Sequence, residues 1–471
     1  MNQAVEDRWR HLLSRGLAPA TVTICLGEGI HALNTFIVST TMPSVVVDLG
    51  GVRFIAWAST VYLVAAIVGG ASAGYLKQRI GARVALIGAA ATFAAGTLCV
   101  SFAASMPVVL VGRTLQGAGD GVIAAACYAL VAELFPSRLV PKMFGLLAVI
   151  WALAAFGGPL AAGILTETVS WRAAFLVNIP MIGAFAVLVA LIIPRATVDG
   201  GARGLPAGRL AAIASGIMLV AVAGLATQPL HAAAAIAAAM ALLVSTFVVD
   251  RRSRHRLFPS DAFSPRSTVG AVLWVVLLMP LAQVCTSVYL PLLLQQQWGY
   301  GPTLAGSFAA ITALAWSGAA MLVAYLKATA TGLIMIRLGP VMVAAGLAGV
   351  AIAVPLGLPL LLALCQIMIG AGFGVSWAFL SQAVMTHARP GETDTASGLV
   401  PTAQAAGYAI GAALSGLVAH AAGLSNALDR ATIAQASFWI FATGAVLAMG
   451  AVVFSFAVRL RPATDAAGIR N

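Results

Sequence analysis

The sequence predicts an all-α protein that crosses a membrane many times. Of its 471 residues, 61% are hydrophobic and only 8% are charged, and the mean hydropathy is +0.99. Soluble domains are about half apolar and about a quarter charged. Apolar runs of about 20 residues, the length that spans a bilayer as a helix, follow one another along the whole chain. A polytopic membrane protein is the only class that fits this composition.

The apolar runs are separated by charged or Pro- and Gly-rich breaks, and they fall into groups of six, two and six. We therefore predict two six-helix bundles with an inserted two-helix hairpin, 14 spans in all. The predicted domains are a cytoplasmic N-terminus 1–19, a first bundle 20–194, a linker with the hairpin 195–267, a second bundle 268–458 and a cytoplasmic tail 459–471. A twelve-span alternative would leave two long apolar segments outside the membrane. The predicted spans are 20–47, 54–76, 82–104, 106–130, 142–165, 172–194, 208–228, 232–250, 268–294, 302–326, 334–354, 358–386, 395–420 and 435–458.

The placement of the basic residues predicts the orientation. With the N-terminus in the cytoplasm, only Arg53, Arg172 and Arg430 of the 26 Lys and Arg residues fall outside, and Arg113 falls within a span. Cytoplasmic loops carry such an excess of positive charge, so both termini are expected in the cytoplasm and the number of spans is even. The net charge of +12 is then a topology signal. It calls for no nucleic-acid partner.

One predicted span, 106–130, carries polar residues within the bilayer. Arg113, Gln116 and Asp120 lie at i, i+3 and i+7, which places them on one face of a helix. A charged side chain at this depth costs at least about 2.5 kcal/mol and must face protein or a water-filled cavity. This helix is therefore expected to line a polar space.

Two acids are predicted to lie deep in the membrane, Glu28 and Asp120. The helical rise of 1.5 Å per residue places both near the midplane, and it places Asn34 and Arg113 at a similar depth to each other, which predicts a hydrogen bond between them. Buried acids are functional sites by default, and these two could carry an exchanged proton. The alternative is an Arg113–Asp120 pair that only stabilises packing, although i and i+7 lie about 10.5 Å apart. His31, one turn from Glu28, either modulates it or only hydrogen-bonds it.

Other residues are candidates for a substrate cavity and for gating. Each cavity candidate has a packing or lipid-facing alternative. Gly158-Pro159 predicts a helix kink, which is compatible with gating. The predicted cavity residues are Trp151, Gln283, Trp316, Trp377, Phe379 and Gln404, with Gln116 beside them.

An internal repeat supports the two-bundle organisation. Residues 74–81 and residues 332–339 both read G-x-x-x-x-R-x-G. Both segments are predicted to be cytoplasmic turns two helices into each bundle, a parallel repeat of the kind that transporters use. Arg79 and Arg337 would then hold the cytoplasmic side closed in one state, or would only mark the topology.

Taken in order, the motifs of this chain resemble those of the major facilitator superfamily, and in particular its fourteen-span drug:proton antiporters. Residues 74–83 resemble the loop signature G-x-x-x-D-R-x-G-R-R, with Gln78 in place of the acid. Residues 33–43 resemble the first-helix signature L-D-x-T-(I/V)-V-N-x-A-L-P, with Asn34 in place of the aspartate. The other matching segments are 113–117 (R-x-x-Q-G), 145–163 (Gly145, Gly158, Pro159 and Gly163 of the antiporter motif), 171–180 (W-R-x-x-F-x-x-N-x-P) and 289–296.

The resemblance implies the major facilitator fold and export of small lipophilic compounds by proton antiport with alternating access. The residues themselves predict proton coupling at Glu28 and Asp120, supported by Arg113, Asn34, His31 and Gln116, and gating by Gly74, Arg79, Gly81, the antiporter-motif residues and Arg337. Two alternatives stay open: a facilitator or importer of a metabolite without antiport, and a membrane sensor that transports nothing. We expect a monomer in the bacterial inner membrane, with no enzyme activity, no metal site and no cofactor besides the coupling proton.

Overall fold

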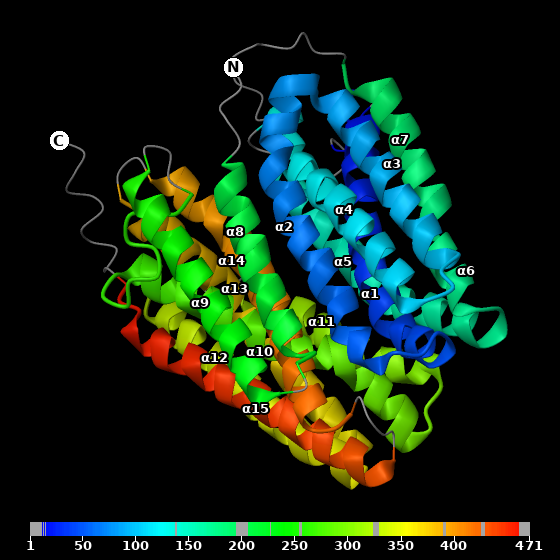
Figure 1. Ribbon diagram of the computed structural model, residues 1–471. Coiled ribbons are helices and arrows are strands. Elements are labelled where there is room, and N and C mark those ends of the chain that lie inside the picture. Colours follow the sequence, from blue (N-terminus) through cyan, green and yellow to red (C-terminus); the bar gives the residue numbers. More distant parts are fainter. Residues whose placement is uncertain are drawn as a thin grey trace, which may run out of the picture. The chain divides into compact units, whose positions relative to one another are not determined.

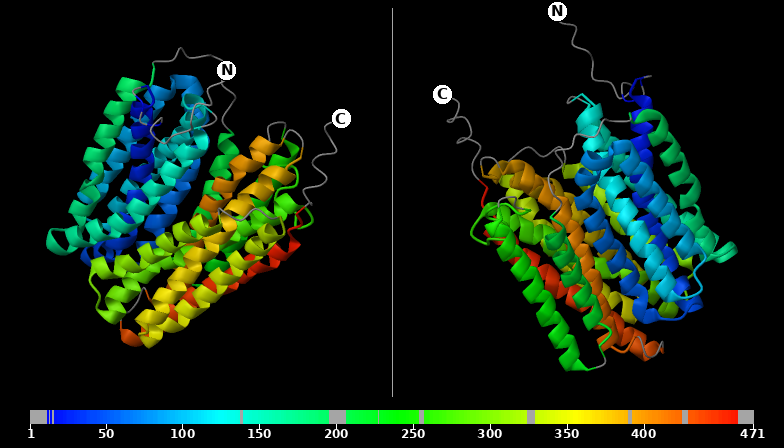
Figure 2. Two further views of the ribbon diagram at one scale, coloured as in Figure 1. Left: turned by 180° about the vertical axis from the view of Figure 1, so that it is seen from behind. Right: turned by 45° about the horizontal axis from the view of Figure 1, so that its top comes forward.

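The computed structural model is entirely helical over the part of the chain that it describes, residues 12, 14, 16–136, 139–194, 206–226, 228–253, 257–323, 329–389, 392–424 and 429–460. Figure 1 shows the helices in sequence colours, and Figure 2 shows them from two further sides. The predicted N-terminus and tail lie largely outside the described residues. The helices are α1 (Ala18–Asp48), η2 (Val52–Phe54), α2 (Ile55–Ile80), α3 (Ala82–Ser101), α4 (Met106–Leu134), α5 (Val140–Thr168), α6 (Trp171–Leu176), α7 (Asn178–Ile192), α8 (Ala207–Ala223), α9 (Pro229–Arg252), α10 (Thr268–Trp298), α11 (Pro302–Val323), α12 (Thr329–Leu356), α13 (Pro359–His387), α14 (Thr393–Ala421) and α15 (Arg430–Ala457).

Twelve helical segments in the described chain are long and apolar enough to cross a membrane, and α6 and α7 together count as one of them. The composition prediction of a polytopic membrane protein is confirmed at this level. The remaining two predicted spans correspond to α8, which has only 17 residues, and to α14. The predicted span 208–228 extends past the end of the helix, because α8 ends at Ala223 and a turn follows at Gly224.

The chain divides into two compact units. Unit 1 comprises residues 1–50 and 64–210, and unit 2 comprises residues 51–63 and 211–471. The division falls within α2, whose first residues pack with unit 2: Ala56 meets Gly416 of α14, and Trp57 packs against Val220, Ala239 and Ala413. Helices α8 and α9 thus share an apolar cluster with α14.

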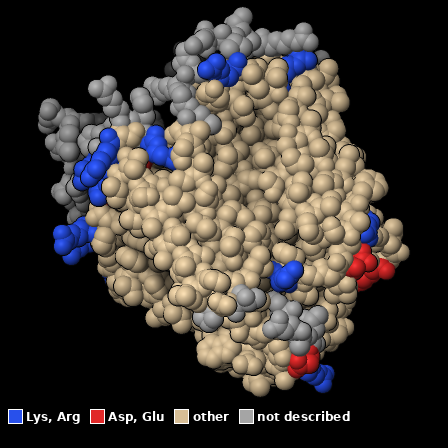
Figure 3. Space-filling view, in the orientation of Figure 1, with Lys and Arg blue, Asp and Glu red and all other residues tan. Residues whose placement is uncertain are grey.

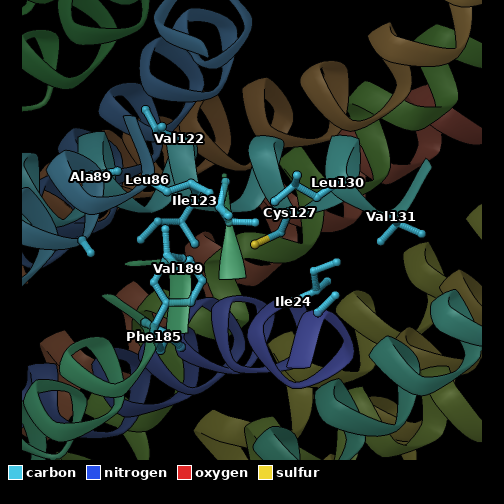
Figure 4. Close-up of a cluster of buried hydrophobic side chains, with 14 of the residues drawn as sticks. Ile24, Leu86, Ala89, Val122, Ile123, Cys127, Leu130, Val131, Phe185 and Val189 are labelled. Carbon is cyan, nitrogen blue, oxygen red and sulfur yellow. The ribbon is translucent and has the colours of Figure 1, made fainter. Parts of the chain in front are cut away.

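Unit 1 has an apolar core where α1, α3, α4 and α7 meet. Figure 4 shows part of it, with Ile24, Ile123, Cys127 and Phe185 among its members. Gly27 permits the close approach of α1, since a Cβ at this position would lie 2.7 Å from the Cys127 sulfur and 2.9 Å from the Phe185 ring. At the far end of α1, Asp48 accepts hydrogen bonds from Trp171 Nε1 at 3.0 Å and from Arg172 Nη1 at 2.9 Å. Because Trp171 opens α6, this contact joins the end of α1 to the start of the α6–α7 segment.

The two units repeat one motif in their packing. Residues 117–121 of α4 read G-A-G-D-G, and residues 370–374 of α13 read G-A-G-F-G. In α4, a Cβ on Gly121 would overlap the Ala66 carbonyl oxygen of α2, and one on Gly119 would overlap the Ala89 carbonyl oxygen of α3. In α13, the corresponding Gly374 and Gly372 face the carbonyl oxygens of Trp316 and Gly339 in the same way. This repeat places Phe373 at the position that Asp120 occupies in unit 1.

Residues 74–81 and 332–339 share a sequence pattern, but the prediction that both are turns is wrong. Gly81 does form the turn between α2 and α3, with a φ of +81° that glycine tolerates. The second segment lies inside α12, which begins at Thr329. Gly339 is therefore not a turn residue; it brings α12 against Gly372 and Ser376 of α13. A helix accepts glycine where a neighbouring backbone comes this close.

The surface has the distribution expected of a membrane protein. On the face shown in Figure 3, Lys, Arg, Asp and Glu lie near helix ends, and uncharged residues cover the helix flanks between them. The flanks carry many exposed apolar side chains, including Leu153, Phe156 and Val446, each at least 63% exposed. Lipid tails satisfy such surfaces without cost, since they are as apolar as the side chains.

Asp429 caps the start of α15 and supplies a pH-dependent prediction. Its carboxylate accepts hydrogen bonds from the Thr432 hydroxyl and from the backbone N–H groups of Thr432 and Ala431, and these bonds hold its pKa below the usual value. A lowered pKa in the folded state means that the cap stabilises the helix at neutral pH and is lost as the pH falls through that lowered pKa. Hydrogen exchange at the Thr432 amide should therefore accelerate at acidic pH relative to Asp429→Asn, whose cap does not titrate; equal profiles for the two proteins would contradict this.

Candidate functional site

Both deep acids predicted from the sequence lie in unit 1 and are fully buried. Glu28 of α1 is 1% exposed, and Asp120 of α4 is 0% exposed. Among the described membrane-spanning helices, acids at their ends aside, these two are the only acids. Each is positioned by polar side chains from neighbouring helices of the same unit.

His31 of α1 pairs with Asp120 of α4. Its Nδ1 lies 2.5 Å from Asp120 Oδ2, a short contact between two groups that can both exchange protons. His31 lies one turn from Glu28, and its ring nitrogen contacts Asp120, the acid of the neighbouring helix. His31 was expected either to modulate Glu28 or only to hydrogen-bond it. The structure shows a hydrogen bond to an acid, but that acid is Asp120 of α4 and not Glu28 of α1.

Glu28 is held by two aromatic donors. Trp151 Nε1 of α5 donates to Glu28 Oε1 at 2.7 Å, and the Tyr128 hydroxyl of α4 donates to the same oxygen at 3.2 Å. The Trp151 ring also meets the His31 ring edge-on, with centroids 5.4 Å apart. The two acids are therefore joined through His31 and Trp151 into one network that spans α1, α4 and α5.

The Trp151 hydrogen bond should matter for function. On the sequence-based hypothesis that Glu28 carries an exchanged proton, Trp151→Phe, which keeps a stacking ring but removes the N–H, should reduce proton-coupled transport on the order of tenfold, the effect of losing one strong hydrogen bond. Proton and substrate fluxes in vesicles measure it. Tyr128→Phe, which removes the longer bond, is the matched comparison and should have the smaller effect. A larger effect at Tyr128 would contradict this ranking.

The hydrogen bond predicted between Arg113 and Asn34 is not formed. Arg113 Nη1 instead donates to Gln116 Oε1 at 2.7 Å, one turn along α4, and Gln116 Nε2 donates to Thr97 of α3 at 2.9 Å. The side-chain atoms of Asn34, which is 0% exposed, find no hydrogen-bond partner among the described residues. Similar depth in two helices did not bring these side chains together: Arg113 bonds Gln116 on its own helix, and Gln116 reaches Thr97 of α3.

The predicted cavity residues of unit 2 lie in several different surroundings. Trp316 of α11 stacks on the buried Phe373 of α13, with ring centroids 4.8 Å apart, and Trp377 lies 5.8 Å from Trp316. Phe379 lies elsewhere on α13, against Gly332 of α12. The amides remain within their own helices: Gln283 donates to Thr286 at 3.0 Å, and Gln404 hydrogen-bonds Tyr408. Their role in binding substrate stays a prediction.

The predicted gating residues occupy varied surroundings. Gly158, with Pro159 inside α5, packs closely on Phe36 of α1. Gly145 and the buried Gly163 lie on the same helix. Gly74 has open space around it, and the exposed Arg79 lies over the Tyr75 ring at 5.6 Å. Arg337 lies over the Phe456 ring at 5.0 Å, and its Nε is buried without a hydrogen-bond partner among the described residues. Their movement stays a prediction.

Sequence reasoning missed Tyr128 and the second packing repeat. Tyr128 lies eight residues after Asp120, two turns further on nearly the same face of α4, so helical spacing alone could have indicated it. The G-A-G-x-G repeat was also visible in the sequence. The Glu28–Trp151 bond was not, because it joins residues 123 positions apart.

The fold is shared with solved transporters. The structure is similar to that of a peptide transporter POT (TM-score 0.68, 17% identity, 93% of this chain and 94% of that one), and to a D-xylose–proton symporter (TM-score 0.67, 16% identity, 95% and 99%). At such identities the likeness shows the fold alone, and that fold is the one of multi-pass membrane transporters.

The sequence comparisons then establish the family. The profile of the Major Facilitator Superfamily matches residues 24–412, and the chain belongs to this superfamily. A Mycobacterium tuberculosis (strain H37Rv) protein described as a probable multidrug-efflux transporter is 30% identical over 429 residues, which cover 88% of this chain and 90% of that protein. The protein is thus a membrane transporter, and enzyme function is not indicated.

Proposed function

We propose that this protein exports small lipophilic compounds in exchange for protons. The observation that carries the proposal is the network of His31, Asp120, Glu28, Trp151 and Tyr128, which holds two acids inside the membrane-spanning part of one unit. Intramembrane acids are expensive and mark proton pathways in transporters. The similarity to a multidrug-efflux transporter supports the lipophilic substrate class.

The network can couple protonation to structure. A carboxylate only accepts hydrogen bonds, whereas a protonated carboxyl group must also donate one. Proton uptake at Glu28 therefore changes its bonding to the two donors Trp151 and Tyr128, and uptake at Asp120 changes its contact with His31. These contacts join α1 to α4 and α5, so each proton gained or lost alters the packing between helices.

We extend the proposal to the architecture. In it, α8 and α14 also cross the membrane, giving fourteen spans with an inserted hairpin, and both termini lie in the cytoplasm of a bacterial inner membrane. The distribution of Lys and Arg supports this orientation. Substrate would be moved by alternating access, with the first six spans rocking against the last six.

Proteoliposomes that hold a pH gradient test the function. Purified protein is reconstituted with an internal pH dye, and lipophilic cations and neutral drugs are added one by one. Proton movement that is triggered by a compound and collapses when the gradient is removed would support antiport. Absence of coupled proton movement for every compound, while a labelled compound still equilibrates, would overturn it.

That second outcome would favour a facilitator or importer. One observation favours this alternative: Asn34 and Gln78 replace two acids of the resembled drug antiporters. Accumulation of substrate in cells that express the protein, in place of exclusion, would be its direct evidence.

A further inference from the structure

Two buried asparagines of unit 1 have no explained partners. Asn34 of α1 and Asn178, the first residue of α7, are both 0% exposed. Neither Nδ2 nor Oδ1 of either side chain forms a hydrogen bond with any described residue. Buried polar groups are hydrogen-bonded as a rule, to protein or to water, and each exception calls for an explanation.

Counted from the Gly27–Phe185 contact, helix geometry places the two amides at one level between α1 and α7. The helices meet at Gly27 and Phe185 and run in opposite directions, because α1 ends at Asp48 where Trp171 opens the segment leading into α7. Asn34 follows Gly27 by seven residues, and Asn178 precedes Phe185 by seven. Seven residues make almost two full turns, so both amides lie on the contacting faces, about 10.5 Å beyond the Gly27–Phe185 contact.

A third helix borders the same level. Gly27 also contacts Ile123 of α4, and seven residues before Ile123 lies the buried Gln116, whose side chain is already bonded to Arg113 and Thr97. The level therefore offers the two amide side chains, and no described residue forms a hydrogen bond with their Nδ2 or Oδ1 atoms.

Bound water fits this set of groups. An internal water makes two to four hydrogen bonds to polar groups that lack protein partners, and the two amides supply both donors and acceptors. A metal cation is disfavoured, since the positively charged Arg113 is buried one turn from Gln116 on the bordering helix. His31, which pairs with Asp120, lies one turn from Asn34 on α1.

We propose that Asn34 and Asn178 bind internal water between α1, α4 and α7, and that this water relays protons to and from the His31–Asp120 pair. The relay rests on the proposed function, in which Asp120 exchanges the proton. In the resembled transporters an aspartate stands where this chain has Asn34. Here the amide keeps the position hydrated, while the titrating acid is Asp120 on the neighbouring helix.

The relay is tested without any substrate. Infrared spectroscopy of the membrane-embedded protein follows hydrogen–deuterium exchange of the proton between His31 and Asp120 through the shift of the Asp120 carboxyl or carboxylate band, which is assigned by its loss in Asp120→Asn. Asn34→Leu and Asn178→Leu remove the hydrogen-bonding groups at similar volume, and we expect exchange to slow by about tenfold or more as a relay step is lost. Gln366→Leu is the matched control, because Gln366 is equally buried in unit 2 and its Oε1 also lacks a described partner. Exchange at the wild-type rate together with a raised melting temperature in the leucine variants would show a dry contact and overturn the proposal.

A second measurement uses only the wild-type protein and so does not depend on how the variants fold. Radiolysis of bound water oxidises side chains beside it, and Phe175 is fully buried one turn before Asn178. We expect oxidation at Phe175 and none at Phe441, which is equally buried in unit 2. Lack of oxidation at both would overturn the water site. Failure of drug-driven proton movement would leave both measurements unchanged, so it would count against the proposed function alone.

Discussion

Asp120→Asn is expected to abolish proton movement driven by substrate while leaving the protein folded. The amide has nearly the shape of the carboxyl group and can still contact His31, but it cannot take up or release a proton. The loss of a proton-transfer group at an essential step corresponds to a reduction of at least about a hundredfold. The measurement is the initial rate of pH change in proteoliposomes after drug addition.

The control for this substitution is Glu167→Gln, which removes an exposed acid at the end of α5. It should keep wild-type coupling. Glu28→Gln separates the roles of the two acids: near-normal proton release in this variant would assign the exchanged proton to Asp120 alone. Full coupling in Asp120→Asn would disprove the role of Asp120 as proton carrier.

Gly121→Ala should be among the most destabilising conservative changes in the chain. The added Cβ would overlap the Ala66 carbonyl oxygen, so α2 and α4 would have to separate. Overpacking of this kind costs about 1–3 kcal/mol, and here the obstacle is backbone, which cannot rotate away. We expect a lower yield of folded protein and a lower melting temperature in detergent.

Gly88→Ala is the matched control for Gly121→Ala. Gly88 lies on α3 with open space around its Cβ direction. Alanine is the better helix former by about 1 kcal/mol, so this variant should be as stable as the wild type or more stable. Equal stability of Gly121→Ala and Gly88→Ala would mean that α2 and α4 can separate at little cost.

The membrane character and helix positions could be predicted from the sequence because they depend on local composition. A run of about 20 apolar residues identifies a span wherever it occurs, as with α4 and α10. Local composition failed where a segment could be either turn or helix. Residues 332–339 contain glycine and arginine, as residues 74–81 do, but only Gly81 forms a turn in the first segment, whereas all of the second segment lies within α12, where Gly339 packs against α13.

The two acids of the candidate site could be predicted from the sequence, but the side chains that bond to them could not. Glu28 and Asp120 could be identified as buried, because charge inside an apolar span has few explanations. Depth along a helix also suggested that Arg113 would meet Asn34, and this was wrong. Depth gives one coordinate, whereas a hydrogen bond also depends on the rotation of each helix about its axis, and that rotation is set by the packing of its glycine faces.

The sequence by itself determined that this chain is a multi-pass membrane protein, how its charge is distributed along the spans, and which two acids lie within them. These properties follow from the free energy of placing each residue type in lipid, which is local. Only the tertiary structure decided that His31 holds Asp120, that Trp151 and Tyr128 hold Glu28, and that the side chains of Asn34 and Asn178 find no hydrogen-bond partner among the described residues. Those outcomes depend on contacts between helices distant in sequence, which no single segment encodes.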